Sequence, residues 1–146
     1  MTTHHERFWE HDRFAFVGNT EARGFPTLSY TELRAKPGKH VYAVDPSVPE
    51  VEGDRTYPDL ASLPEPVDAI VIETPPEETA SWVRRAAEAG IHDVWIHMGR
   101  ETPEALDVAR ERGLDVRTGT CAVMYVKPGP SFHSLHKWIN KALGKY

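Results

Sequence analysis

The stretch FAFVGNTEARGFP, residues 14–26, decides how the rest of the chain is interpreted. Its opening residues are apolar and mostly aromatic, which predicts a short buried strand, and Gly18 allows the chain to turn sharply after it. A strand and turn of this kind are typical of the first unit of a nucleotide-binding α/β fold. The G-x-G-x-x-G fingerprint of dinucleotide sites is absent, however, because Thr20 stands where the second glycine belongs.

Short apolar runs of the same kind recur along the chain. With the first run they predict strands over residues 14–17, 40–44, 69–72, 93–97 and 115–117. The first four do not alternate with polar residues for long enough to suggest a hairpin that faces water on one side. We therefore expect strands that are buried on both faces and run parallel.

Helix-forming patterns occupy the segments between these strands. They cover residues 27–35, residues 74–89 with Thr74 as the N-cap, and residues 102–112, while residues 57–66 suggest a single helical turn between prolines. The alternation of strands and helices predicts a Rossmann-like, doubly wound α/β fold, with a mainly parallel sheet of about five strands and helices on both faces.

The composition fits one ordinary folded domain. The chain has 146 residues, of which 40% are hydrophobic and 27% charged, and no apolar run approaches the ~20 residues that cross a bilayer. Residues 1–13 are charged and lack the apolar core of a signal peptide, so we expect a short solvated leader and a cytoplasmic protein. Cys121 is the only cysteine, which excludes a disulfide within the chain and a cysteine-based zinc cluster.

Charge is unevenly distributed along the chain. Residues 120–146 contain four lysines and no acidic residue, whereas the formal charge of the whole chain is -5. The acidic body argues against nucleic-acid binding, which needs a broad basic face. We expect residues 1–126 to form the domain, and residues 127–146 to form a basic amphipathic helix. That helix should pack on the domain or on a second copy in a homodimer, and not on a membrane.

In an open α/β sheet of this kind the ligand crevice lies at the carboxyl ends of the strands, where the strand order reverses. The loop after the first strand offers Gly18, the Thr20 hydroxyl and the Arg23 guanidinium, and the next helix adds free backbone amides. Asp45 follows the second strand, where an acidic residue can bind ribose hydroxyls, and His97 ends the fourth. No nucleophile, histidine and carboxylate stand at a spacing that predicts a catalytic set or a metal site.

These segments together resemble the CoA-binding domain family, small stand-alone relatives of the N-terminal domain of the succinyl-CoA synthetase α subunit. The resemblance spans residues 14–126. It rests on VGNT with Pro26 downstream, VYAVDP, YPDLASLP with VDAIVI, AAEAGIHDVWIHMG, and ARERGLDVRTGTC. It implies coenzyme A or an acyl-CoA as the ligand, and a loop that needs one tight glycine turn and a helix N-terminus in place of three glycines.

The resemblance also implies which residues bind the ligand. The CoA phosphates map onto Gly18, Asn19, Thr20, Arg23 and the helix after Pro26; the adenosine maps near Val44, Asp45 and Pro46; the crevice is completed by Thr74, Pro75, Pro76, Ile96, His97, Met98 and Gly99. The chain departs from the family at Phe25 and Asp45, where an arginine and an asparagine are usual, and at Glu73-Thr74, which replaces a polar or basic pair. Cys121 matches a family cysteine, for which we expect a packing role, with a mixed disulfide to CoA as the alternative.

The sequence therefore favours a protein that binds CoA or an acyl-CoA without catalysing a reaction, as a sensor, carrier or regulator. An enzyme that uses NAD(P) or transfers an acyl group is the first alternative, supported by Asp45, Glu73 and His97. The second is an interaction module that has lost its ligand and works through the basic tail, which the family departures favour.

Overall fold

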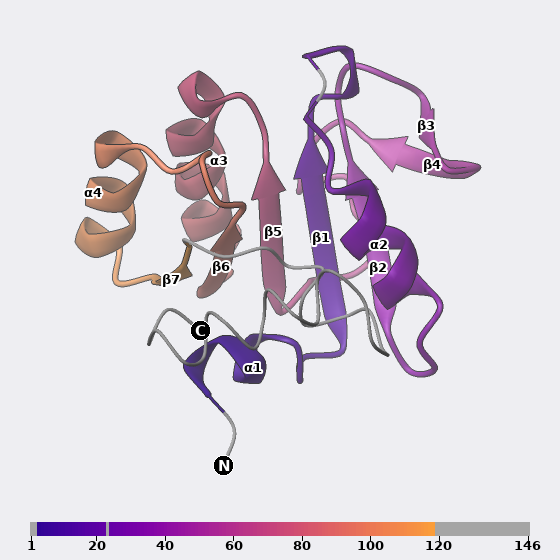
Figure 1. Ribbon diagram of the computed structural model, residues 1–146, viewed down its shortest axis with the longest axis horizontal. Helices are drawn as coiled ribbons and strands as arrows, with labels where there is room; N and C mark the ends of the chain where they lie inside the picture. Colours follow the sequence, from indigo (N-terminus) through magenta and orange to yellow (C-terminus); the bar gives the residue numbers. More distant parts are fainter. Residues whose placement is uncertain (1–2, 23, 119–146) are drawn as a thin grey trace.

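The core of the fold is β1 (Arg13–Gly18), in which every residue after Arg13 is buried. Successive side chains of a strand point to opposite faces, so Phe14 and Phe16 lie on one side of the sheet and Ala15 and Val17 on the other. A strand that is apolar on both faces must be covered on both. The computed structural model describes residues 3–22 and 24–118, and it places helices on each side of this strand (Figure 1).

The remaining elements follow the predicted alternation. In chain order they are α1 (His4–Phe8), β1, the short 3-10 turn η1 (Thr20–Ala22), α2 (Thr27–Arg34), β2 (His40–Val44), β3 (Glu50–Val51), β4 (Asp54–Tyr57), β5 (Ala69–Glu73), α3 (Pro76–Glu88), β6 (Asp93–Ile96), α4 (Pro103–Glu111) and β7 (Asp115–Arg117). The five predicted strands are confirmed to within a residue at each end.

The strand order across the sheet is β3-β4-β2-β1-β5-β6-β7. All neighbouring strands pair in parallel except β3 and β4, which form an antiparallel hairpin at one edge. The chain builds outward from β1 through β2 to β4, then returns to the other side of β1 to start β5. The order therefore reverses between β1 and β5, and a doubly wound sheet is expected to bind its ligand at the carboxyl ends of these two strands.

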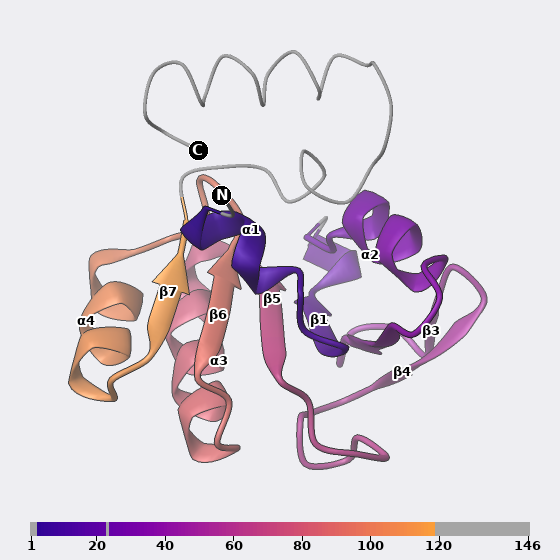
Figure 2. The ribbon, with the colours of Figure 1, turned by 90° about the horizontal axis from the view of Figure 1, so that it is seen from below.

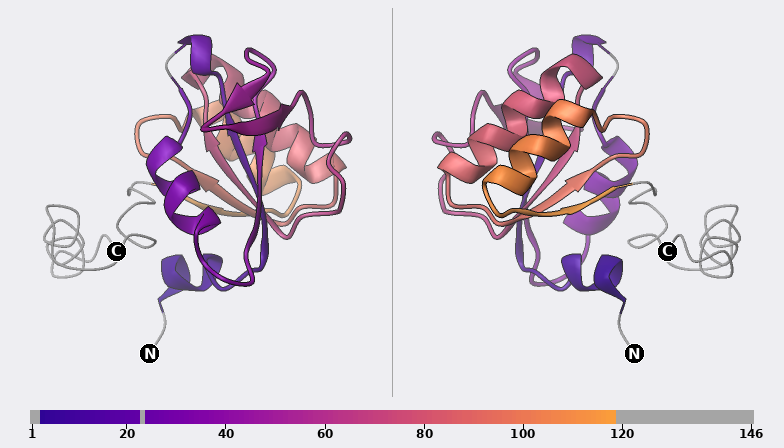
Figure 3. Two further views of the ribbon diagram at one scale, coloured as in Figure 1. Left: turned by 90° about the vertical axis from the view of Figure 1, so that its right-hand side faces the viewer. Right: turned by 90° about the vertical axis from the view of Figure 1, so that its left-hand side faces the viewer.

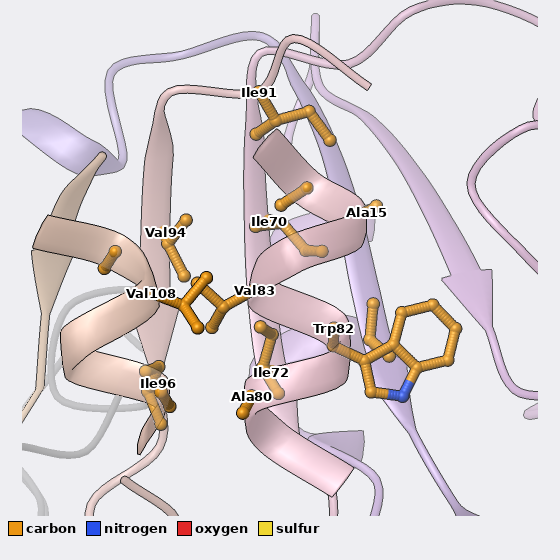
Figure 4. Packing of buried hydrophobic residues seen from close by; sticks show 14 of the residues in the cluster. Ala15, Ile70, Ile72, Ala80, Trp82, Val83, Ile91, Val94, Ile96 and Val108 are labelled. Atoms are coloured by element: carbon orange, nitrogen blue, oxygen red, sulfur yellow. The ribbon is translucent and has the colours of Figure 1, made fainter. Parts of the chain in front are cut away.

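Two separate apolar layers hold the helices to the sheet (Figures 2 and 3). On one side α3 and α4 pack through Ala80, Val83 and Val108 against the β5 and β6 side chains, as Figure 4 shows. On the other side α1 and α2 cover an aromatic layer, whose largest members are Phe8, Trp9, Phe14, Phe16, Tyr30 and Trp95. The predicted helices on both faces of a mainly parallel sheet are thus confirmed.

The sheet is larger than predicted, with seven strands in place of about five. The additional strands, β3 and β4, are short and rich in charged residues, so their sequence has no strand-like apolar run. The Tyr30 hydroxyl donates to Asp54 Oδ2 at 2.5 Å, which ties β4 to α2. Residue 57 ends β4, and residues 58–66 form bends and turns with no helix, which corrects the expectation of a helical turn there.

The expectation of a solvated leader is also wrong. Thr3 caps α1 through a capping box with Glu6, and the short helix places Phe8 and Trp9 in the aromatic layer. Trp9 stacks on Phe14 with ring centroids 5.7 Å apart. The sequence feature that could have predicted this burial is the pair Phe8-Trp9 within an otherwise charged stretch.

A network of ion pairs fixes α1 at the amino ends of the strands (Figure 1). His11 Nε2 lies 2.5 Å from Asp93 Oδ2, and His4 Nε2 lies 2.9 Å from Asp115 Oδ1. The Arg117 guanidinium is buried, with 5% of its side chain exposed, and contacts both aspartates. These charges are paired with one another, so we assign this edge of the sheet a structural role.

The predicted C-terminal helix, Cys121 and the boundary near residue 126 all lie outside the described residues. Among residues 3–22 and 24–118, no helix is long and apolar enough to span a membrane.

Candidate functional site

The site begins where β1 ends, because Gly18 is enclosed by the loop that follows it. A Cβ atom at Gly18 would lie 2.3 Å from the Gly24 carbonyl oxygen and 2.6 Å from Phe25 Cα. Real Cβ atoms do not approach other atoms this closely, so only glycine fits here. In the register of the sheet Gly18 pairs with Glu73 of β5, which puts the loop directly at the strand-order reversal.

The loop after β1 closes on itself. Asn19 and Gly24 form an antiparallel bridge, in which the Gly24 amide donates to the Asn19 carbonyl at 2.9 Å. The Asn19 side chain accepts from the Ala22 amide at 3.2 Å and donates to Glu78 Oε2 at 3.0 Å. These hydrogen bonds hold the loop closed, and the bond to the Glu78 carboxylate connects the loop to α3.

Asp45 fastens the same loop to the end of β2. Its Oδ2 accepts from the Thr20 amide at 2.9 Å and from the Thr20 hydroxyl at 2.5 Å. Its Oδ1 accepts from the Ser47 amide at 2.9 Å and from the Ser47 hydroxyl at 2.6 Å. The residue is 1% exposed, and an ionised carboxylate has about four lone-pair sites. Asp45 is therefore saturated by the protein itself, and the Thr20 hydroxyl proton is directed to it.

Glu73 and His97 form a second polar cluster, on the other side of β1. Ile72 and Ile96 pair in the sheet, so the residues that follow them emerge side by side. His97 Nδ1 lies 3.1 Å from Glu73 Oε1, and the two side chains are 24% and 15% exposed. Arg100 lies beside them, with its Nη1 donating to the Thr74 carbonyl at 3.5 Å.

A tight turn brings Arg100 to this position. The Arg100 amide donates to the His97 carbonyl at 3.0 Å, and Gly99 has a φ of 86°. That backbone conformation strongly favours glycine at the third position of the turn. The turn after β6 thus folds Arg100 back towards the end of β5.

Burial shifts the pKa of both members of the Glu73–His97 pair. It raises the pKa of the Glu73 carboxyl, with the Arg100 charge acting in the opposite direction. Burial also lowers the pKa of His97, and the Arg100 charge lowers it further while Glu101 acts against this. Each shift disfavours the charged form of the group concerned, as burial away from water does.

Two helix N-termini lie near the site, and neither is capped by a side chain. Pro75, and not Thr74, is the N-cap of α3; no side chain caps this end, and Glu77 and Glu78 stand in its first turn. Thr74 is buried instead, with its hydroxyl 3.5 Å from that of Thr79. Pro26 is the N-cap of α2, whose first turn holds no acidic residue. Of the two helix ends, α2 therefore suits an anion better.

The structure brings most of the predicted site residues to one edge of the sheet. Gly18, Asn19, Thr20, Asp45 and Pro46 lie on one side of the reversal, and Thr74, Pro75, His97, Met98 and Gly99 lie on the other. Val44 and Ile96 are fully buried in the core, so only their backbone can face a ligand. Pro26 is buried, Pro76 is exposed, and Arg23 is outside the described residues.

Sequence reasoning missed three contributors to this edge. Ser47 and Arg100 were not predicted as site residues, because their positions depend on turns that no sequence pattern indicates. Pro58, at the end of β4, lines a cavity of about 330 Å³ together with Asp45 and Pro46. A larger cavity of about 660 Å³ runs from Pro46 and Pro58 along α3 to Ala89. Recognition of β4 as a strand would have pointed to Pro58.

Known structures share this fold. Prb, a redesigned protein, superimposes with a TM-score of 0.70 at 22% identity, over 83% of this chain and 85% of that one. A conserved hypothetical protein from Pyrococcus furiosus gives a TM-score of 0.64 at 27% identity, over 75% and 95%. The dinucleotide-forming acetyl-coenzyme A synthetase 1 of Ca. Korarchaeum cryptofilum matches with a TM-score of 0.57 at 21% identity, over 72% of this chain but only 25% of its own.

The sequence matches the family model of the CoA binding domain over residues 12–127. That range contains β1, the strand-order reversal, the Gly18 loop and all four strand ends that form the candidate site. On this match, the chain belongs to the CoA-binding domain family.

Proposed function

We propose that the protein binds coenzyme A or an acyl-CoA at the carboxyl edge of its sheet, and that it acts without catalysing a reaction, as a sensor, carrier or regulator. The observation that carries the proposal is the family match over residues 12–127, combined with a glycine turn closed at the strand-order reversal. One of the similar structures is a dinucleotide-forming acetyl-coenzyme A synthetase, which agrees with this ligand class.

The geometry supports one orientation of the ligand. The cavity beside Asp45, Pro46 and Pro58 suits the adenine ring, because it lies at the ends of β2 and β4 and its lining includes three prolines and a valine. The pyrophosphate then lies near Gly18 and the α2 N-terminus, which carries a positive partial charge. The pantetheine arm runs on over the ends of β5 and β6.

The same contacts weigh against a dinucleotide site. A ribose diol at the end of β2 needs a carboxylate oxygen as acceptor. Both oxygens of Asp45 already accept two hydrogen bonds each, from Thr20 and Ser47. The hydroxyls of Thr20 and Ser47 both donate to Asp45, so these donors are already used within the protein.

Calorimetric titration of the purified protein with CoA, dephospho-CoA and NAD, at two salt concentrations, tests the proposal. We expect micromolar binding of CoA that weakens at higher salt, because the ligand carries phosphates. Arg23→Ala should weaken CoA binding about tenfold, as loss of one charge-assisted phosphate contact does. Arg84→Ala is the matched control, since Arg84 is exposed on α3 and pairs with Glu104.

The other outcomes separate the alternatives. NAD binding in preference to CoA would contradict the proposed ligand and revive the enzyme hypothesis. Turnover of an acyl-CoA by the protein would contradict the non-catalytic role and leave the ligand standing. If no nucleotide binds at either salt concentration, the proposal fails, and the interaction-module hypothesis becomes the one to test.

A further inference from the structure

Arg100 is the charged group at the ligand edge that the proposed CoA contacts leave unused. It is partly buried, and in the part of the chain that the structure describes its guanidinium lies within ion-pair distance of no carboxylate. Its one polar side-chain contact there is the long bond to the Thr74 carbonyl. The neighbouring Glu101 carboxylate accepts instead from the Gly99 amide at 2.9 Å and the Thr118 hydroxyl at 3.1 Å.

The Glu73–His97 pair lies beside Arg100 without an ion pair to it, because among the described residues no Glu73 oxygen is within ion-pair distance of the guanidinium. The contact uses His97 Nδ1, and no hydrogen bond to Nε2 is found among residues 3–22 and 24–118. Among these residues, therefore, His97 Nε2 and all of the Arg100 guanidinium except the contact to Thr74 are without a hydrogen-bond partner.

The surroundings make this charge distinctive. Around the other strand ends and the α3 N-terminus, the described charged residues include the carboxylates of Glu21, Asp45, Glu77 and Glu78. Arg100 instead lies beyond β5, next to the end of β6, on the side of the reversal that lies away from the cavity at Pro46 and Pro58. A ligand with its adenine in that cavity would bring its acyl end to Arg100.

We propose that Arg100, with the Glu73–His97 pair, forms a subsite for an acyl group that ends in a carboxylate, so that the protein prefers the CoA thioester of a dicarboxylic acid. A guanidinium binds a carboxylate through two parallel N–H donors, which a methyl-ended acyl group cannot satisfy. The His97 Nε2–H supplies a further donor for the acyl carboxylate or the thioester carbonyl. This inference rests on the proposed function, since it assumes that the CoA part binds as described above.

The test compares malonyl-CoA with propionyl-CoA, which differ mainly in a terminal carboxylate against a methyl group. Calorimetry on the full chain should show malonyl-CoA binding about tenfold more tightly, while CoA itself also binds. Arg100→Gln should remove this preference and leave CoA affinity unchanged, and Arg100→Lys should keep part of it. Arg84→Gln, on the exposed face of α3, is the matched control and should keep all of it.

A second measurement follows the subsite directly. The ring resonances of His97 should shift when malonyl-CoA binds, and shift less with propionyl-CoA. Malonate alone, at millimolar concentration, tests whether a free carboxylate suffices; we expect a weak response that disappears in Arg100→Gln. Thermal unfolding of each variant shows whether it is folded.

Each outcome decides between the two proposals. If CoA binds but malonyl-CoA and propionyl-CoA bind equally, the acyl subsite is refuted and the proposed function stands. The same holds if the preference persists in Arg100→Gln. If neither CoA nor any thioester binds, both proposals fail.

Discussion

Two carboxylates flank the carboxyl end of β1, Asp45 from the β2 side and Glu73 from the β5 side. Asp45 accepts four hydrogen bonds from Thr20 and Ser47, and it connects two loops. Among residues 3–22 and 24–118, Glu73 has His97 as its one partner at ion-pair distance, and burial raises the pKa of Glu73. The same functional group thus serves as a structural connection where hydrogen-bond donors surround it, and as a titratable group where they do not.

The comparison depends first on the glycine turn that separates the two carboxylates. Gly18→Ala would force a Cβ atom against the Gly24 carbonyl and Phe25, and the loop backbone would have to move. We expect a loss of roughly 3 kcal/mol or more in the free energy of unfolding. Chemical denaturation measures this effect.

Gly38→Ala is the control for that substitution. Gly38 has a φ of 80° with open space around a Cβ, so its replacement costs only about 1 kcal/mol of backbone strain. Equal losses in the free energy of unfolding at the two positions would show that the loop after β1 accommodates the added Cβ atom. The loop would then not be rigidly closed.

The structural role of Asp45 gives the next largest effect. Asp45→Ala removes a buried carboxylate that accepts hydrogen bonds from two backbone amides and two hydroxyls. We expect a loss of about 2–4 kcal/mol and faster amide exchange at Thr20 and Ser47. Asp59→Ala, which removes the acceptor of the Ser62 amide in an exposed turn, should cost less than about 1 kcal/mol. If the two aspartate variants unfold alike, Asp45 is not the connection described.

The sequence predicted those parts of the fold that are encoded by local patterns. Strands β1, β5 and β6 are buried over nearly their whole length, so each appears as an almost uninterrupted apolar run. Strand β4 has no such run, because it is held by contacts from distant residues, such as Thr56 to the Val48 carbonyl and Tyr30 to Asp54. Helix α1 was missed for the same reason, since His4 pairs with a residue that lies 111 positions away.

The candidate site, too, could be predicted from the sequence only in part. The topological rule for doubly wound sheets directed attention to the strand ends, and the structure places Asp45, Thr74 and His97 there. The partner of each residue was not predictable, because it depends on side-chain geometry in the folded loops. The sequence suggested that Thr20 offers a hydroxyl to a phosphate, whereas the fold directs that hydroxyl to Asp45. Arg100 reaches the site only through the turn at Gly99.

The smallest expected effect concerns Glu73 and depends on pH. Because burial raises its folded pKa above the ordinary value of 4.5, Glu73 contributes stability at low pH that is lost as the pH rises through the folded pKa. Glu73→Gln does not titrate, and its side chain has nearly the same size and shape as that of glutamate. The variant should therefore be more stable than the natural protein at pH 8, by about 1 kcal/mol, and the difference should shrink towards pH 5.

Thermal unfolding of both proteins at the two pH values measures this difference, and Glu111→Gln, at an exposed position, should show no such pH dependence. His97 and Arg100 are present in both proteins, so their own contributions largely cancel in the comparison. A Glu73→Gln variant that is less stable at pH 8 would mean that the ionised carboxylate is well compensated in the fold. Glu73 would then resemble Asp45, and the contrast between the two sides of β1 would disappear, because both carboxylates would serve as structural connections.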